Sequence, residues 1–355
     1  MIHARGLARS FRTKAGPVDA VRGIDLDVAA GEIVGLLGPN GAGKTTTLRM
    51  LTTLLMPSAG TATVAEHDLV REPREVRRAI GYVAQVGAAP SAGTLVGEEL
   101  VTQARLQGMS KASAAARLAD LAPRLDLGGL ERRALLELSG GQRRRFDVAL
   151  GLMHSPSLVF LDEPTAGLDP QSRANLWQHI RSLRDDDGVT VVLTTHYLEE
   201  ADALADRILV MDDGRIVADD SPDALKARIA GDVVTMTLDA ATDDDLVRAA
   251  SAVRSATDPR DVVTRPGELL VTVDNGAVAV APLMRAVDAA GLTLSSVSVD
   301  RPSLDDVFLT LTGRSLREDA VATDAAHPTK ANPAKPTKAD PADPAEPAAT
   351  VTAGR

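Results

Sequence analysis

The chain has no cysteine and few aromatic residues. Without cysteine there is no disulfide framework and no thiolate metal site, and such a composition suits a reducing compartment. No run of about 18 apolar residues occurs, so we expect no transmembrane helix. Residues 1–11 hold no long apolar stretch either, so we expect no secretory signal there.

An excess of basic residues is also missing, since the formal net charge is −10. A strongly basic surface would favour a nucleic acid or an anionic membrane, and this balance argues against both as partners. We therefore expect that a role in any membrane process is carried out at the cytoplasmic face of the cell membrane, through a separate protein that spans the bilayer.

Short apolar runs recur through residues 1–230. Three of them, at residues 32–37, 158–161 and 190–194, are continuous rather than alternating. Continuous runs of this length are typical of strands that are buried on both faces of a parallel sheet flanked by helices. The pattern predicts an α/β domain over residues 1–230.

Residues 231–315 follow a different pattern. The order of runs predicts β-α-β-β-α-β, a small α+β domain of ferredoxin-like type; its strands are expected at 233–238, 262–264, 269–273 and 292–299, and its helices at 243–253 and 278–290. A capped amphipathic helix over 303–312 follows, and we expect it to pack on this small domain. Residues 316–355 are rich in alanine and proline, which predicts a disordered tail.

A glycine-rich segment matches the phosphate-loop pattern GxxxxGK[ST]. It follows the apolar run that ends at Leu37 and precedes a predicted helix over 45–55, which is the strand–loop–helix context that the chemistry needs. Backbone N–H groups and the helix N-terminus would bind phosphate, the Lys44 amine would reach the β- and γ-phosphates, and the Thr45 hydroxyl would bind Mg²⁺. The candidate ATP-binding residues are Gly38, Pro39, Asn40, Gly41, Ala42, Gly43, Lys44, Thr45 and Thr46.

Two acidic residues follow the buried run at 158–161. Carboxylates at the carboxyl end of such a strand lie beside the phosphate loop in parallel sheets. Asp162 is therefore a candidate Mg²⁺ ligand, and Glu163 a candidate to polarise the attacking water. Taken alone, the pair is as well explained by a strand that ends at a charged turn.

The segment Leu138–Gln142, here called the signature segment, indicates which class of phosphate-loop protein this is. Ser139 and Gln142 form the pattern of a capping box that opens a helix over 142–152. The capping box leaves Gly140 and Gly141 unexplained, because glycine weakens the first turn of a helix. Glycine at these positions suits the close approach of an anion to the backbone.

With these motifs in this order, residues 1–230 resemble the ABC (ATP-binding cassette) ATPases. The resemblance implies a P-loop NTPase fold with a helical subdomain and an antiparallel β part, and a homodimer in which two cassettes meet head to tail across two ATP molecules. It also implies roles for further residues: Phe11 stacks on adenine, Gln85 senses Mg²⁺ and faces the membrane subunit, Asp169 lies in the dimer-contacting loop, and His196 contacts the γ-phosphate. Under this resemblance Glu163, His196 and Gln85 are catalytic; the ligands of Mg²⁺ are Thr45, Gln85 and Asp162; and the signature residues Ser139, Gly140, Gly141 and Gln142 cap the ATP of the partner cassette.

The sequence just before the predicted tail indicates whether the transporter exports or imports its cargo. Residues 301–313 resemble the tail of the daunorubicin/doxorubicin-resistance ATP-binding subunits, a drug-export branch that works with a separate membrane permease. Residues 86–95 are more neutral and glycine/alanine-rich than that branch leads us to expect, which leaves the partner's identity open. An ATPase for another cargo, such as a lipid, a polysaccharide or an imported solute, is the alternative. A non-transport cassette acting on DNA is disfavoured, because the stretch between Lys44 and Ser139 is too short for a long coiled coil.

Overall fold

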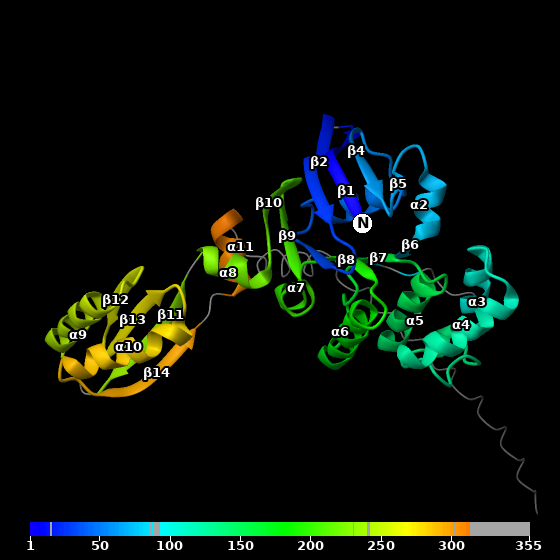
Figure 1. Ribbon diagram of the computed structural model, residues 1–355. Coiled ribbons are helices and arrows are strands. Elements are labelled where there is room, and N and C mark those ends of the chain that lie inside the picture. The colour runs from blue at the N-terminus through cyan, green and yellow to red at the C-terminus, as the bar shows by residue number, and fades with distance from the viewer. Residues whose placement is uncertain are drawn as a thin grey trace, which may run out of the picture.

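The structure is a computed structural model that describes residues 1–14, 16–85, 87, 93–229, 231–239, 242–300 and 303–312. Three sheets organise these residues (Figure 1). The first sheet is antiparallel, with strand order β2-β1-β4-β5. Its strands are β1 (Ile2–Thr13), β2 (Gly16–Val28), β4 (Ala59–Val64) and β5 (His67–Asp68).

The second sheet lies at the centre of the first 220 residues and has the order β10-β9-β3-β8-β7-β6. Its strands pair in parallel except for β10, which is antiparallel to β9. Every residue of β3, β7 and β8 is buried, which confirms the prediction of a parallel sheet covered on both faces. The strands are β3 (Ile33–Leu37), β6 (Ile80–Val83), β7 (Leu158–Asp162), β8 (Thr190–Thr195), β9 (Arg207–Asp212) and β10 (Arg215–Asp220).

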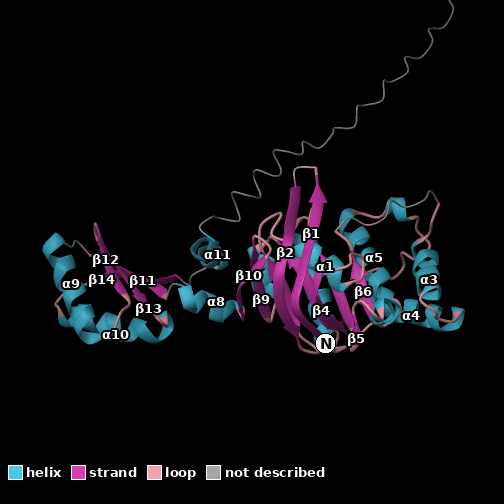
Figure 2. Ribbon diagram, turned by 90° about the horizontal axis from the view of Figure 1, so that it is seen from above, coloured by secondary structure: helices cyan, strands magenta, loops and turns pink. Residues whose placement is uncertain are grey.

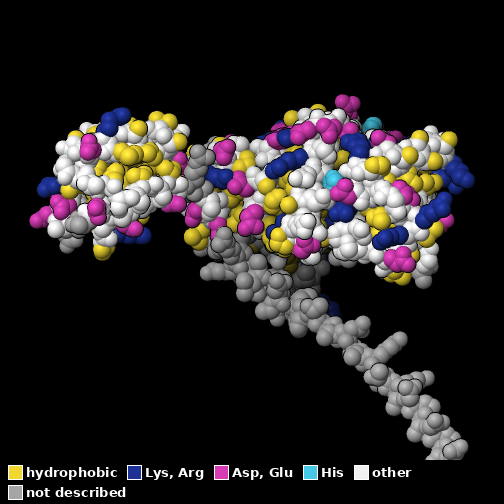
Figure 3. Space-filling view, turned by 90° about the horizontal axis from the view of Figure 1, so that it is seen from below, with side chains coloured by type: hydrophobic (Ala, Val, Ile, Leu, Met, Phe, Trp, Pro, Cys, Tyr) yellow, Lys and Arg dark blue, Asp and Glu magenta, His cyan; other side chains and the backbone are white. Residues whose placement is uncertain are grey.

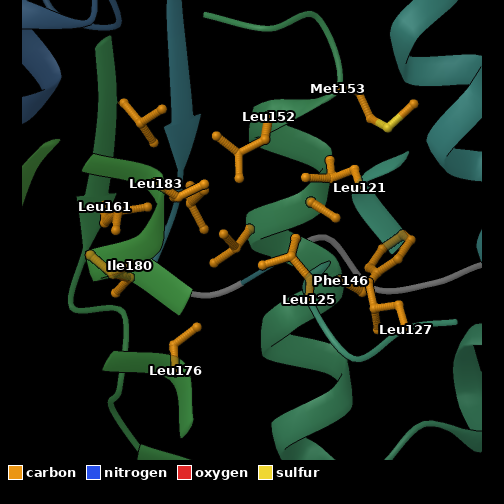
Figure 4. Close-up of a cluster of buried hydrophobic side chains, with 14 of the residues drawn as sticks. Leu121, Leu125, Leu127, Phe146, Leu152, Met153, Leu161, Leu176, Ile180 and Leu183 are labelled. Atoms are coloured by element: carbon orange, nitrogen blue, oxygen red, sulfur yellow. The ribbon is translucent and has the colours of Figure 1, made fainter. Parts of the chain in front are cut away.

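Helices surround this sheet, and three of them form a separate group at one side (Figures 1 and 2). These are α3 (Val96–Leu106), α4 (Lys111–Arg124) and α5 (Gly140–Leu152). Leu121 and Leu125 at the end of α4 belong to the same buried cluster as Phe146 of α5 and Leu161 of β7 (Figure 4). The position of α5 is thus fixed by apolar packing against the strand that carries the acidic pair. The other helices of this region are α1 (Lys44–Leu51), α2 (Pro73–Ala79), α6 (Pro170–Asp185), α7 (Leu198–Leu204) and α8 (Pro222–Ile229).

Two predicted helix boundaries beside the candidate site were wrong. Helix α1 ends at Leu51 rather than at residue 55, because Thr53 adopts a left-handed conformation with φ 62° and the Thr52 hydroxyl donates to the Leu48 carbonyl. Helix α5 begins at Gly140 rather than at Gln142, so both signature glycines lie within its first turn.

The third sheet is antiparallel throughout, with the order β12-β13-β11-β14. Helices α9 and α10 cover one face and share a core with the strands. Both the element order and the strand order agree with the predicted ferredoxin-like split unit. Its elements are β11 (Asp232–Leu238), α9 (Asp243–Ala256), β12 (Asp261–Arg265), β13 (Glu268–Val273), α10 (Gly276–Ala289) and β14 (Leu294–Asp300).

The last described helix, α11 (Leu304–Thr312), corrects another expectation. Ser303 and Asp306 cap it as predicted, but it packs beside α8 and α7 rather than on the third sheet (Figure 1). Its buried residues join a cluster drawn from β3, α7, β9 and α8, comprising Leu304, Val307, Phe308, Leu37, Ala201, Ala205, Ile208, Val210 and Leu225. The physical reason is that α9 and α10 already close the core of the third sheet, whereas this cluster needs an apolar cover.

None of the described helices combines the length and apolar character that a membrane span requires. On the face shown in Figure 3, acidic and basic side chains are interspersed. The predicted disordered tail at 316–355 lies outside the described residues, as does most of the segment 86–95.

Replacing Phe308 by alanine tests the docking of α11. Phe308 is fully buried, so Phe308→Ala should lower the free energy of unfolding by about 3–5 kcal/mol. Urea unfolding followed by the fluorescence of Trp177, which lies in α6, reports on the region around the central sheet. The neighbouring Leu309 is 48% exposed, so Leu309→Ala should change that free energy by no more than about 0.5 kcal/mol. An unshifted Trp177 transition in Phe308→Ala would contradict this packing.

Candidate functional site

The phosphate loop connects β3 to α1 and is closely packed from behind. A Cβ atom on Gly38 would lie 2.2 Å from the Met211 carbonyl oxygen, and one on Gly43 would lie 2.5 Å from that of Ala20. Gly43 also has φ 104°, a conformation that L side chains rarely adopt. Glycine at these two positions therefore lets the loop lie against β2 and β9.

Lys44 is almost fully buried in this loop. Its Nζ donates to the carbonyl oxygens of Gly38 at 2.6 Å and Pro39 at 3.0 Å. Burial lowers the pKa of Lys44 to about 8, although the nearby carboxylates of Glu163 and Asp162 oppose the shift. Among the described residues, two carbonyl dipoles and two acidic neighbours stabilise this buried cation inside the loop.

Asp162 lies at the carboxyl end of β7 and joins three adjacent segments. Its Oδ1 accepts a hydrogen bond from the Thr45 hydroxyl at 3.0 Å and another from the Thr194 hydroxyl at 2.6 Å. Its Oδ2 is buried with no hydrogen-bond partner among the described residues. An orphaned carboxylate oxygen beside a threonine hydroxyl is the kind of hard oxygen donor set that Mg²⁺ prefers, so the residues present fit the ion.

Glu163 follows in a left-handed backbone conformation with φ 44°. Its amide donates to the Thr194 hydroxyl at 3.0 Å, its Oε2 accepts from Gln85 Nε2 at 2.7 Å, and its Oε1 lies 3.3 Å from His196 Nδ1. Burial alone would raise the pKa of Glu163, but the His196 ring, the Lys44 cation and the Gln85 amide together outweigh burial and lower it. The carboxylate is therefore held ionised within reach of the loop.

The signature segment opens α5 as a complete capping box. Ser139 Oγ accepts from the Gln142 amide at 3.3 Å, and Gln142 Oε1 accepts from the Ser139 amide at 3.0 Å. A Cβ on Gly140 would meet nothing within 4 Å, whereas one on Gly141 would lie 2.7 Å from Ser172 Oγ. Gly140 thus presents an open backbone surface at the positive end of a helix.

Not all predicted site residues come together. Lys44, Thr45, Gln85, Asp162, Glu163 and His196 form one connected cluster in the described structure. The contacts of the other candidates lie elsewhere. Phe11 is a partly exposed residue of β1 with the Arg9 guanidinium 4.8 Å from its ring centroid, and Asp169 caps α6 by accepting from the amides of Gln171 and Ser172.

Two residues of this cluster escaped the sequence analysis. Thr194 bonds both Asp162 and the Glu163 amide, and a hydroxyl at the end of a buried run was a signal for it. Arg144 in α5 donates to the carbonyls of Asp162 and Glu163. Nothing in the run Arg143–Arg145 distinguishes it from its neighbours, so no sequence signal pointed to it.

Comparison with known proteins agrees with this geometry. The family model described as ABC transporter matches residues 21–166. The chain is 45% identical over 315 residues to the daunorubicin/doxorubicin resistance ATP-binding protein of Streptomyces peucetius, covering 88% of this chain and 93% of that protein. This chain belongs to the ABC transporter ATP-binding proteins.

Other relatives of this cassette protein carry resistance names as well. The doxorubicin resistance ATP-binding protein of Mycobacterium tuberculosis is 41% identical over 84% of this chain and 89% of its own length. The linearmycin resistance ATP-binding protein of Bacillus subtilis is 34% identical, and the match covers 90% of this chain and 100% of that protein. The dimeric structure of a bacterial ABC transporter cassette superposes with a TM-score of 0.57 at 25% identity, covering 62% of this chain and 98% of that one. The predicted resemblance to the drug-export branch is therefore confirmed.

The cassette protein accordingly binds and hydrolyses ATP and couples that energy to an exporter, together with a transmembrane partner component. These comparisons concern the whole protein and its fold. The role of each side chain in the cluster rests on the geometry described above.

The pKa of Lys44 predicts how ATP binding depends on pH. Only the protonated amine attracts phosphate, so ATP affinity should be constant below about pH 8 and then fall by up to tenfold per pH unit. The measurement is a titration with a fluorescent ATP analogue from about pH 7 to about pH 9.5 without Mg²⁺.

Lys44→Arg is the matched control for this titration. Its guanidinium stays charged throughout the range, so whatever affinity the variant keeps should not change with pH. A wild-type affinity that is flat across the range would show that Lys44 does not titrate there.

Proposed function

We propose that the cluster around Asp162 and Glu163 is the ATP-hydrolysing site, in the roles that the sequence predicted. The observation that carries this proposal is the position of the Glu163 carboxylate, which Gln85 and His196 hold at the end of β7 beside buried Lys44. The proposal places a base, a phosphate-binding cation and an oxygen donor set at one edge of the central sheet.

Each residue has a distinct task in this site. Phosphate-loop amides and Lys44 bind the β- and γ-phosphates, and Glu163 orients a water and accepts its proton as the water oxygen attacks the γ-phosphorus and the bond to the ADP oxygen breaks. His196 would contact the γ-phosphate. Mg²⁺, held by Thr45, Asp162 and Gln85, would offset the negative charge of the phosphates.

A head-to-tail homodimer would complete the site. The first amides of α5 have no partner within the helix, and the open surface at Gly140 lets an ATP phosphate approach them. Ser139, Gly140, Gly141 and Gln142 of one cassette would then cap the ATP held by Lys44 of the other. Asp169 would lie at the dimer contact, and Phe11 would stack on adenine through its ring face.

A groove beside the Gln85 segment suits the membrane permease. It has a volume of about 410 Å³, and its lining includes Tyr82 of β6, Glu99 of α3, Asp147 of α5 and His154, which follows α5. Its lining includes Ala84, which directly precedes Gln85, so a helix of the permease seated here would lie close to the contact between Gln85 and Glu163. The cassette would work there at the cytoplasmic face of the membrane.

The domains follow from the same reasoning. We propose residues 1–230 as the cassette and 231–315 as an accessory domain whose last helix docks back on the cassette.

The cargo would be a hydrophobic drug or antibiotic, in line with the names of the resistance relatives. Export of another cargo is the second candidate, because a Nod factor export ATP-binding protein of Cupriavidus metallidurans is 37% identical over 87% of this chain.

Replacing Glu163 by glutamine tests the site. Glutamine keeps the shape but cannot accept the proton, so Glu163→Gln should lower steady-state ATPase activity by at least about 100-fold. Because ATP can still bind, the variant should form an ATP-dependent dimer in the presence of Mg²⁺, measured by size-exclusion chromatography with light scattering.

Glu66→Gln serves as the control for this test, since Glu66 lies in an exposed turn after β4. It should hydrolyse ATP at the wild-type rate and form no lasting dimer. A Glu163→Gln protein that dimerises with ATP and still turns over normally would refute the assignment of Glu163 as the base.

A further inference from the structure

Arg144 is a buried cation in the second turn of α5, with only 7% of its surface exposed. Within the part of the chain that the structure describes, its guanidinium makes five hydrogen bonds, and every acceptor is a main-chain carbonyl. Nε donates to Pro164 at 2.6 Å; Nη1 donates to Ala84 at 2.7 Å and Gln85 at 3.4 Å; Nη2 donates to Asp162 at 3.0 Å and Glu163 at 3.1 Å. These bonds use all five N–H donors of the side chain.

The five carbonyls belong to two segments only. Three are consecutive and surround Glu163, whose backbone is in the left-handed region. The other two belong to the segment of Gln85, whose side chain bonds the Glu163 carboxylate. One guanidinium therefore fixes the backbone of both residues that meet at that hydrogen bond.

The neighbouring arginines do not share this arrangement. Arg143 lies 3.4 Å from Asp147 one turn along α5, and Arg145 donates to Asn175 of α6. These contacts are with side chains, whereas the acceptors of Arg144 are main-chain carbonyls. All three arginines carry the same charge, so Arg144 differs from its neighbours by its position in α5.

Burying this cation is unfavourable by itself. Desolvation lowers the pKa of Arg144, and the surrounding carboxylates of Asp147, Glu200, Asp162 and Glu163 only oppose that shift. A buried guanidinium with no hydrogen-bonded carboxylate is stabilised through its carbonyl partners. An apolar side chain at this position would leave the five carbonyls to find other donors.

We propose that Arg144 is a positioning residue for ATP hydrolysis, which holds the Glu163 and Gln85 backbones in fixed register with the helix that carries the signature segment. Because Arg144 is two residues beyond Gln142, a displacement of α5 moves the backbone of Glu163 directly. The inference deepens the proposed function and rests on its assignment of Glu163 and Gln85.

The test replaces Arg144 by lysine and by alanine in the full-length protein. An ammonium group keeps the charge but cannot span carbonyls on both segments. Misplacement of a reacting group by about 1 Å costs about 100-fold in rate, so kcat should fall by about 10- to 100-fold in both variants. ATP affinity, measured with the fluorescent analogue, should stay at the wild-type value, because the hydrogen bonds of Arg144 go to the Glu163 and Gln85 segments and not to the phosphate loop.

Two further measurements separate positioning from general stability. Added ethylguanidinium should partly restore kcat in Arg144→Ala by filling the vacated space, while ethylammonium should not. Arg207→Lys is the matched control, because Arg207 also forms several hydrogen bonds but does so at the start of β9, to Asp219 and the Asp27 carbonyl. That control should keep the wild-type kcat. If Arg144→Ala does not fold, Arg144→Lys carries the test.

The outcomes are distinguishable. A lower kcat with unchanged ATP affinity supports the proposal. An unchanged kcat in Arg144→Lys overturns it, and so does a parallel loss of kcat, ATP affinity and unfolding free energy, which would mark a purely structural role. If Glu163→Gln itself keeps normal turnover, the proposed site fails; if Glu163→Gln is inactive and Arg144→Lys is normal, only the role of Arg144 fails.

Discussion

Two hydrogen bonds to Asp162 fix the relative positions of the segments around the cluster. Through the Thr45 and Thr194 hydroxyls, Asp162 connects β7 to the start of α1 and to the end of β8. Lys44 directly precedes Thr45, Glu163 directly follows Asp162, and His196 comes two residues after Thr194. A shift of β7, β8 or α1 would therefore separate the Lys44 amine, the Glu163 carboxylate and the His196 imidazole. The parallel register of the sheet is thus a condition for the site.

Charge balance adds a second constraint. Two buried cations, Lys44 and Arg144, lie near two acidic side chains, Asp162 and Glu163. The carboxylates oppose the effect of desolvation on the pKa of Lys44, while His196, Lys44 and Gln85 lower the pKa of Glu163 against the effect of burial. ATP brings more negative charge than one lysine can neutralise. The orphaned Oδ2 of Asp162 is the place where a divalent cation would restore the balance, which is a physical reason to expect Mg²⁺ there.

The sequence predicted the parallel sheet, the phosphate loop and the acidic pair, because these depend on local patterns and short spacings. It did not predict Arg144, whose partners lie 18 to 60 residues away along the chain, nor the bonds of Thr194. The amphipathic pattern of residues 303–312 showed that one face of α11 would be covered, but it could not show by what. Contacts between distant segments depend on how the layers assemble, and a single sequence does not reveal that.

The docking of α11 changes how the C-terminal sheet relates to the rest of the chain. Residues 231–300 leave the cassette after α8 and the chain returns beside α8 at α11, so this unit is topologically an insertion with both ends anchored at one place. Truncation before residue 303 would therefore uncover the apolar surface around Ile208 and Leu225, and such a shortened chain would be prone to aggregate even with its phosphate loop intact.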